Sequence, residues 1–517
     1  MTMKALSKLE KSRSFWSILI ISFLFFLLRL PSIIEPYWYG DEGIYEVIGQ
    51  AIHQGRTLYT DIWDNKPPFL YIMFSFFNGD QESVRTLSLI FGILSTIVFF
   101  FLSQKLFQKL SSTIITTLVF TFLFATPFLE GNIANAENFM LLPILISGLI
   151  IYTHSSLPKI QKSTRQSHLW TSLLRYTHKE EMMIITAGIL LGIAFLFKIV
   201  AIFDLAAFLL FIIFASLREE KRRSNLKKYF LTFDSQCSML VGFFIPLIII
   251  SFYFLINNSL TNFIEAAFFG NVEYVGLNNT FLNIPQGLLL FKLLLLSIAV
   301  VLIFFKRDTF SKRTLFILLW LSFSLFNAFF SHRPYTHYLL VLLPSISLLI
   351  GLIIEITNQK FRLLLLACFF CICVIVKSNF WVGPPTETIR YYQNVILFIT
   401  GNKDVQSYRS FFDKRTPRDY ELASFIKKNT NGSDTIFIWG DSAQIYALAN
   451  KLPIIKYTVA YHITQNKKLM EETQQTLIEV KPKYIITLAE TPPLPFSVPF
   501  YTVRFNRTGA TIYERNF

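Results

Sequence analysis

The sequence is poor in charged residues. Lys, Arg, Asp and Glu make up 16% of its 517 residues, whereas 53% are hydrophobic and 56 are phenylalanine. Soluble globular domains carry about a quarter charged residues, so this shortage argues against a soluble protein. Apolar runs near the length of a membrane-spanning helix, about 20 residues, recur along the chain instead. The sequence therefore predicts an α-helical polytopic membrane protein.

Cysteine is also scarce. The four cysteines do not make a disulfide framework, and three of them lie in the apolar run LLLLACFFCICVIV without a nearby His or acidic partner. These three, Cys368, Cys371 and Cys373, are interpreted as small apolar side chains of a membrane helix. No spacing of His, Cys and acidic residues requires a metal. The prediction is no cofactor, with a divalent cation left as an open alternative.

Acidic residues are fewer than basic ones, and the net charge is +15. In a soluble protein this excess would suggest nucleic-acid binding. Here the basic residues cluster between apolar runs, which is the pattern of cytoplasmic loops, and no basic surface with interleaved aromatics is visible. We therefore predict a membrane partner and no nucleic acid.

About eleven apolar runs are predicted to span the membrane. They lie near residues 15–34, 84–107, 111–128, 138–153, 182–197, 199–217, 236–256, 285–305, 314–331, 338–357 and 361–382. The apolar piece 67–77 is too short to span and is assigned to the membrane interface. The first run lacks a small-residue cleavage site, so it is predicted to be retained as a helix.

The basic residues are divided unevenly between the two sides of this predicted bundle. The N-terminus and alternate loops hold most of them, including the segments REEKRRSNLKK and KRDTFSKR. Because Lys and Arg are enriched in cytoplasmic loops, the N-terminus is predicted to be cytoplasmic. An odd number of spans then places residues 383–517 outside the cell membrane.

The outer side has few basic residues but collects charges at its helix ends. The stretch YGDEGIYEVIGQAIHQGRTLYTDIWDNKPPFLY supplies Asp41, Glu42 and Lys66, and two later loops add further acids and cations, among them Glu130, Glu137, Arg333 and His337. Charges at the mouth of a hydrophobic bundle cost desolvation energy unless they pair or do chemistry. We expect a functional site between membrane and exterior.

Residues 383–517 change in character. Helical and extended patterns alternate there, as in the segment TPRDYELASFIKKNTNGSDTIFIWGDSAQIYALAN, which is typical of a small α/β domain. The turn IWGDS is interpreted as a helix N-cap and not as a phosphate site, because it lacks a Gly-rich loop. The predicted division is a transmembrane catalytic domain over 1–382 and an extracytoplasmic α/β domain over 383–517.

Four features form a specific combination: the Asp-Glu pair after the first helix, the downstream GRTLYTDIWDNKPP, a second outward acid and a late RPYTHYLLVLLP. Together they resemble the integral-membrane GT-C glycosyltransferases, closest to the branch with dolichyl-phosphate-mannose protein mannosyltransferases and the lipid A aminoarabinose transferase. The likeness covers residues 1–382 and is strongest over 38–92. It implies a GT-C-like membrane domain of the metal-independent type.

The resemblance also implies a reaction. Members of this family move a sugar from a polyprenyl phosphate carrier to an outward acceptor and invert the anomeric centre. Asp41 would be the general base, and Glu42 and Glu137 would hold or orient the acceptor. The acceptor could be a protein hydroxyl, a lipid or a glycan, because acceptor choice would reside in variable outer loops.

The cations have matching expected roles. A sugar phosphate leaves as an anion, so cations aimed at it lower the barrier. The resemblance assigns carrier phosphate to Lys66 and places Tyr335 and His337 in a loop covering the phosphate pocket; Arg333 and Lys198 are further candidates. Helix capping by the acids and snorkelling by Lys66 or Lys198 are the plainer alternatives.

Two other classes of function stay open at this point. A transporter or flippase of lipid-linked sugars would show broken helices, polar groups at mid-membrane and repeated halves. The sequence shows no repeat, and its charges lie at the outer mouth except Asp204 and Lys292. A catalytically inactive scaffold relative is the third possibility, and the intact Asp41 argues against it.

Overall fold

The computed structural model describes residues 12–154, 169–220, 227–272, 288–331, 333–507 and 509–516. Parts of the basic loops near 160 and 222 therefore lie outside the described residues. The chain forms two compact units. We call the first the membrane unit (Met1–Arg29, Ser88–Tyr253 and Val272–Pro385) and the second the sheet unit (Leu30–Leu87, Phe254–Asn271 and Thr386–Phe517).

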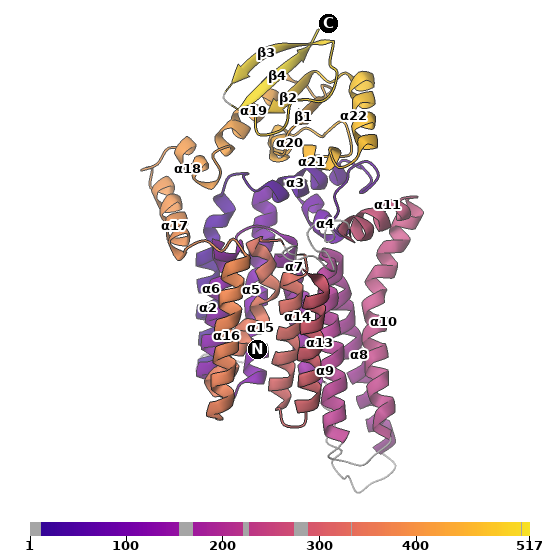
Figure 1. Cartoon of the computed structure of the whole chain (residues 1–517), viewed down its shortest axis with the longest axis vertical. Coiled ribbons are helices and arrows are strands. Elements are labelled where there is room, and N and C mark those ends of the chain that lie inside the picture. The colour runs from indigo at the N-terminus through magenta and orange to yellow at the C-terminus, as the bar shows by residue number, and fades with distance from the viewer. Residues whose placement is uncertain are drawn as a thin grey trace, which may run out of the picture. The chain divides into compact units, whose positions relative to one another are not determined.

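The membrane unit is a helical bundle (Figure 1). Its helices are α2 (Arg13–Arg29), most of α5 (Gln81–Leu106), α6 (Leu110–Ala125), α7 (Ala136–His154), α8 (Leu169–Phe197), α9 (Ile202–Glu220), most of α10 (Lys227–Ile256), α13 (Leu289–Lys306), α14 (Lys312–Phe329), α15 (Leu343–Glu355) and α16 (Gln359–Asn379). Three short 3-10 helices, η2 (Pro127–Leu129), η3 (Ile199–Ala201) and η5 (Thr336–Val341), lie between them in sequence. Each predicted span falls on a helix, except that the described part of the span 285–305 begins at residue 288.

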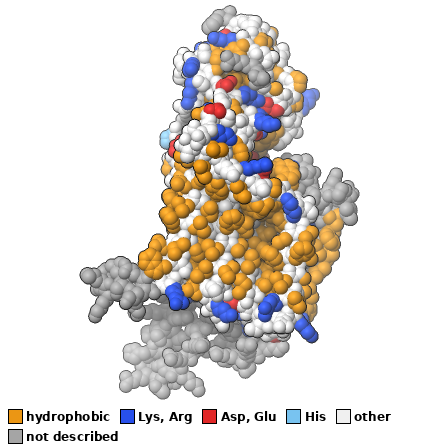
Figure 2. All heavy atoms as spheres, turned by 90° about the vertical axis from the view of Figure 1, so that its left-hand side faces the viewer, with side chains coloured by type: hydrophobic (Ala, Val, Ile, Leu, Met, Phe, Trp, Pro, Cys, Tyr) orange, Lys and Arg blue, Asp and Glu red, His pale blue; other side chains and the backbone are white. Residues whose placement is uncertain are grey.

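Seven helices in the described residues are long and apolar enough to cross a membrane, and three shorter apolar helices accompany them. A helix satisfies its own backbone hydrogen bonds, which lipid cannot do, so apolar runs of this length fold as helices. Figure 2 shows hydrophobic side chains covering much of one face of this unit. The protein is a multi-pass membrane protein.

Contacts between helix ends define one pole of the membrane unit. Arg313 at the start of α14 pairs with Glu355 at the end of α15, and Glu355 also accepts a hydrogen bond from the backbone N of Lys109 at the start of α6, at 2.8 Å. The Lys312 ammonium donates to the carbonyl of Tyr152 near the end of α7, at 2.6 Å. The basic loops before α6 and α14 therefore lie at the same pole, as the alternation of the spans predicted.

The sheet unit carries the α/β structure that the sequence predicted (Figure 1). Its strands are β1 (Ile436–Trp439), β2 (Tyr484–Leu488), β3 (Tyr501–Arg507) and β4 (Ala510–Arg515), in the order β1-β2-β4-β3. Strands β1 and β2 are parallel, and the other neighbours are antiparallel. Helices that precede or connect these strands include α17 (Pro385–Ile399), α18 (Val405–Phe412), α19 (Thr416–Asn429) and α22 (Lys467–Val480).

Several further helical elements belong to this unit. They are η1 (Leu30–Ile34), α3 (Gly40–His53), α4 (Pro68–Phe76), α11 (Leu260–Ile264), the π-helix η4 (Glu265–Phe269), α20 (Gln444–Ala449) and α21 (Ala460–Ile463). Helix α4 coincides with the interfacial piece predicted at 67–77. Its first residue is Pro68, whose fixed φ suits the first helical position.

Helix α3 packs closely on two neighbours. A Cβ at Gly43 would lie 2.8 Å from the backbone N of Gln444 in α20, and one at Gly49 would lie 2.7 Å from the Cβ of Phe74 in α4. Only glycine allows these approaches. This packing is why the compact unit joins residues 30–87 to the C-terminal segment, whereas the sequence-based division grouped them with the membrane helices.

Candidate functional site

Asp41 and Lys66 form an ion pair at the start of α3. The Lys66 Nζ lies 3.4 Å from Asp41 Oδ2, and the Tyr45 hydroxyl donates to the same oxygen at 3.1 Å. Burial raises the pKa of Tyr45 well above its usual value, so the phenol remains a donor. The Asp41 side chain is 40% exposed and that of Lys66 is 21% exposed, so solutes can reach both. A reachable carboxylate beside a fixed cation can accept a proton.

A buried carboxylate supports Lys66 from behind. Asp64 is 3% exposed, lies 3.8 Å from Lys66 Nζ and accepts a 2.6 Å hydrogen bond from the Tyr71 hydroxyl. That hydroxyl also accepts from the Lys66 backbone N at 3.2 Å, and the Tyr59 hydroxyl donates to the Lys66 carbonyl at 2.7 Å. Two tyrosine hydroxyls therefore hold the loop that carries Lys66, one at the backbone N–H of Lys66 and one at its carbonyl.

His462, in α21 of the same unit, faces this cluster. Its Nε2 lies 3.8 Å from Asp64 Oδ1, and its ring packs edge-on against Trp63 at 5.0 Å. Burial lowers the pKa of His462 to about 4, so the ring is neutral at pH 7. A neutral imidazole can shield Asp64 from water without competing with Lys66 for its charge.

Glu42 points away from Asp41 into the interior, as expected for adjacent residues of a helix. Its carboxylate binds Arg85 through two guanidinium nitrogens, at 3.0 and 2.5 Å, and Arg85 also donates to Glu35 at 2.9 Å. All three side chains are at most 1% exposed. Burial and the neighbouring Glu42 raise the pKa of Glu46, one turn further along α3, well above its usual value. This geometry fits Glu42 to anchoring α3 better than to contacting an acceptor.

A second group of predicted site residues lies in the membrane unit, at the pole opposite the basic loops. Glu137 in the first turn of α7 is buried and pairs with Lys198, which lies between α8 and η3. The Lys198 Nζ also lies 4.1 Å from the centre of the Tyr338 ring. A cation held by a carboxylate and an aromatic face keeps its charge out of water at low cost.

Glu130 and His337 form the neighbouring pair of this group. His337 Nδ1 lies 2.8 Å from Glu130 Oε2, and the Thr336 hydroxyl donates to the other Glu130 oxygen at 2.5 Å. Glu130 has a left-handed backbone with φ of 55°, which turns its side chain toward η5. Tyr335 stacks parallel to His337 at 5.7 Å.

Arg333 is half-buried in the segment before η5. The membrane unit thus gathers Glu137, Lys198, Tyr335 and His337 around the ends of α7, α8 and α14. Arg333 is close in sequence to Tyr335 and His337. Among the described residues no group of three or more His, Cys, Asp or Glu side chains could hold a metal ion. The roles predicted for these residues stay predictions.

Sequence reasoning named some residues of the first cluster and missed others. Tyr45 lies four residues after Asp41, a helical spacing that could have identified it. Asp64 stands in the DNKPP motif, but nothing in the sequence indicates that its side chain is buried. Tyr71 is one aromatic among many in an apolar piece. His462 has no signal in the sequence, because the fold brings it from the far C-terminal segment.

Solved structures share this fold. ArnT from Cupriavidus metallidurans bound to undecaprenyl phosphate superimposes with a TM-score of 0.56 at 12% identity, over 97% of this chain and 98% of that one. The apo state of the same protein gives 0.57 at 12% identity, with the same coverage. The Archaeoglobus fulgidus oligosaccharyltransferase covers 98% of this chain and 75% of its own, at 13% identity and a TM-score of 0.47. The likeness to ArnT confirms the predicted GT-C fold.

Sequence comparison adds one local match. Residues 418–498 match the family described as "Putative competence-induced protein Ccs4 C-terminal domain". This segment runs from α19 to beyond β2 in the sheet unit. No curated protein matches the chain.

Proposed function

We propose that the protein is an inverting glycosyltransferase that moves a sugar from a polyprenyl-phosphate carrier to an acceptor on the outer face of the membrane. The observation that carries this proposal is the Asp41–Lys66 pair, a reachable carboxylate 3.4 Å from an ammonium on a GT-C fold. ArnT, a solved protein with this fold, was crystallised with undecaprenyl phosphate. Sugar transfer from a carrier of that class is helped by a cation at the leaving phosphate and by a base at the acceptor hydroxyl.

The pair suggests how one group prepares the other. A carrier phosphate that binds Lys66 competes with Asp41 for the ammonium, which leaves the Asp41 carboxylate available to an acceptor hydroxyl. As the acceptor oxygen bonds to the anomeric carbon, its proton passes to Asp41. The bond between the anomeric carbon and the phosphate oxygen breaks at the same time, and its electron pair leaves with the phosphate. A single displacement with one base inverts the anomeric centre, whereas retention would need a carboxylate nucleophile.

The other predicted residues have roles in this proposal that follow from their contacts. Within the membrane unit Glu137 holds Lys198 and Glu130 holds His337, so each of these side chains is oriented before a phosphate arrives. Arg333 and Tyr335 belong to the same outer segment and contribute to carrier binding. Glu42 is assigned to anchoring α3 through Arg85. The proposed reaction uses no cofactor.

Lys66→Ala tests the carrier role. We expect about 10- to 150-fold weaker use of the carrier, the equivalent of one lost charge-assisted hydrogen bond of about 1.5–3 kcal/mol. Lys66→Arg should restore little of the lost carrier use, because the planar guanidinium of arginine does not replace the compact ammonium of lysine. The measurement is turnover against carrier concentration with released polyprenyl phosphate as the readout. If the effect lies in kcat, Lys66 acts mainly in the transition state; if it lies in KM, it acts on binding.

Lys467→Ala is the matched control for that titration, because Lys467 is a lysine whose side chain is 91% exposed. A Lys66→Ala curve that coincides with the Lys467→Ala curve would remove Lys66 from the site. The snorkelling interpretation of Lys66 would then stand.

The proposed orientation has its own test. In a variant without the four native cysteines, a cysteine at 360 should resist an impermeant thiol reagent in intact cells, and one at 402 should react. Lys360 belongs to the basic pole of the membrane unit, and Asn402 is exposed after α17. The basic pole should face the cytoplasm because Lys and Arg in loops resist translocation. The reverse labelling pattern would place the candidate base in the cytoplasm and contradict the proposed reaction.

A further inference from the structure

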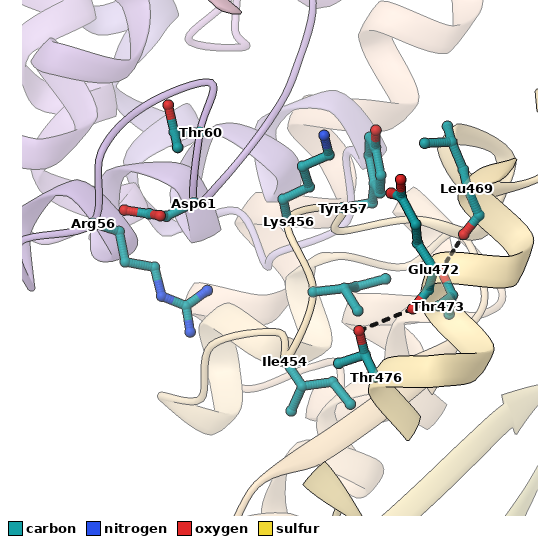
Figure 3. Close-up of a pocket in the computed structure, with 11 residues that line it drawn as sticks. Arg56, Thr60, Asp61, Ile454, Lys456, Tyr457, Leu469, Glu472, Thr473 and Thr476 are labelled. Atoms are coloured by element: carbon teal, nitrogen blue, oxygen red, sulfur yellow. Dashed lines mark hydrogen bonds between the residues drawn. The ribbon is translucent and has the colours of Figure 1, made fainter. Parts of the chain in front are cut away.

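A cavity of about 510 Å³ lies in the sheet unit, next to the loop that carries the candidate site. Figure 3 shows Arg56, Thr60 and Asp61 of that loop on one side and Leu469, Glu472, Thr473 and Thr476 of α22 on the other. The segment 454–457 crosses between them. The volume is within the range of small-ligand sites, about 300–1,000 Å³. The proposed transfer reaction does not use this cavity.

The lining combines opposite charges with hydroxyl groups. Arg56 and Lys456 are cations that can only donate hydrogen bonds, whereas Asp61 and Glu472 are carboxylates that only accept them. Three threonine hydroxyls are added to these. A group that both donates and accepts without carrying charge fits such walls best, and the hydroxyl does both through a single oxygen. An inorganic anion would be repelled by the two carboxylates, and a polycation would be repelled by Arg56 and Lys456.

Part of this polar lining is fixed by the protein itself. Arg56 donates one hydrogen bond to the Pro453 carbonyl, at 3.0 Å, which orients its guanidinium and leaves further N–H groups for a ligand. The hydroxyls of Thr473 and Thr476 donate to their own helix, at 2.7 and 3.0 Å, so their lone pairs are what they offer the cavity. The site is therefore formed before any ligand arrives.

An aromatic layer joins the cavity to the candidate base. Tyr457 lines the cavity and packs edge-on against Trp63 at 5.4 Å. Trp63 packs in turn against His462, whose Nε2 is 3.8 Å from Asp64, the carboxylate behind Lys66. The backbone N of Trp63 also donates to the Lys456 carbonyl at 2.8 Å. A ligand in the cavity is connected to Lys66 through these three rings and the carboxylate of Asp64.

We infer that this cavity binds an uncharged, hydroxyl-rich glycan as a subsite for the acceptor, remote from the hydroxyl that reacts. The role of this glycan as an acceptor rests on the proposed function. The binding of a glycan in the cavity does not depend on it. A remote subsite of this kind holds the acceptor in the sheet unit while Asp41 acts on another of its hydroxyls, so that binding energy is available for orientation.

The test is direct binding of the detergent-purified full chain to an array of uncharged glycans, charged glycans and short peptides, without any carrier-linked sugar. Glu472→Gln is compared with Glu471→Gln. Both acids lie on α22 and each faces a lysine four residues before it, at 3.9 and 3.8 Å, but only Glu472 lines the cavity. Loss of a hydrogen bond to a charged group should weaken binding by about tenfold or more.

We expect binding to one or more uncharged glycans that is weakened at least about tenfold by Glu472→Gln and by Asp61→Asn and is unchanged by Glu471→Gln. Binding of no uncharged glycan, equal affinities of the two glutamate variants, or a preference for peptides or charged glycans would each overturn the inference. Failure of the transferase assay with intact glycan binding would instead overturn the proposed function and leave the binding site standing.

Discussion

Asp41→Asn should lower turnover by about 10²–10⁴-fold, the usual contribution of a general base. The amide keeps the shape of the carboxylate and can still accept the hydrogen bond that Tyr45 donates at 3.1 Å, so α3 should remain in place. It cannot accept the acceptor's proton. Carrier binding should be retained or improved, because Lys66 loses the charge of one carboxylate partner and keeps that of the buried Asp64.

The measurement combines turnover with carrier affinity at equilibrium. Glu82→Gln is a suitable control, because Glu82 is an exposed acid in the first turn of α5 and loses the same charge. A variant with near-normal turnover would show that Asp41 is not the base. A variant with lost carrier binding would show that Asp41 supports the phosphate site instead, whereas a general base predicts carrier binding that is retained or improved.

Local pattern predicted much of the fold. The apolar runs became helices because their length and composition require internal hydrogen bonding, and the proline pair at 67–68 marks the start of α4. The strand IFIW is buried on both faces, as its β-branched and aromatic residues suggest. These features depend on neighbours in the chain, which a sequence displays directly.

Pairings between distant segments could not be predicted in the same way. The charge of Glu42 is visible in the sequence, but Arg85, the cation it binds, lies 43 residues later in a run that reads as a membrane helix. His462 reaches Asp64 only through the packing of the C-terminal segment on loop 54–67. The cavity needs three separate segments to form. Tertiary contacts, and not local propensity, decide these features.

Arg85→Met should produce the largest loss of stability, because it removes the cation from between two buried carboxylates. Arg85, Glu35 and Glu42 are at most 1% exposed, and the guanidinium contacts both acids and the Ser32 carbonyl. Removing one partner of a buried pair typically costs about 3–5 kcal/mol, since an uncompensated charge stays in the interior. The expected result is a clear fall in the unfolding temperature of the purified protein.

The double variant Arg85→Met/Glu42→Gln separates an anchoring role of Glu42 from contact with the acceptor. Replacing both members by neutral groups is often close to neutral for stability, so the double variant should recover much of the unfolding temperature lost by Arg85→Met. Glu35 keeps hydrogen bonds from Trp38 at 3.0 Å and Tyr391 at 2.5 Å. If Glu42 only anchors α3, turnover per folded molecule recovers together with stability. Recovered stability with turnover still low would show that Glu42 acts on the acceptor in addition to anchoring α3.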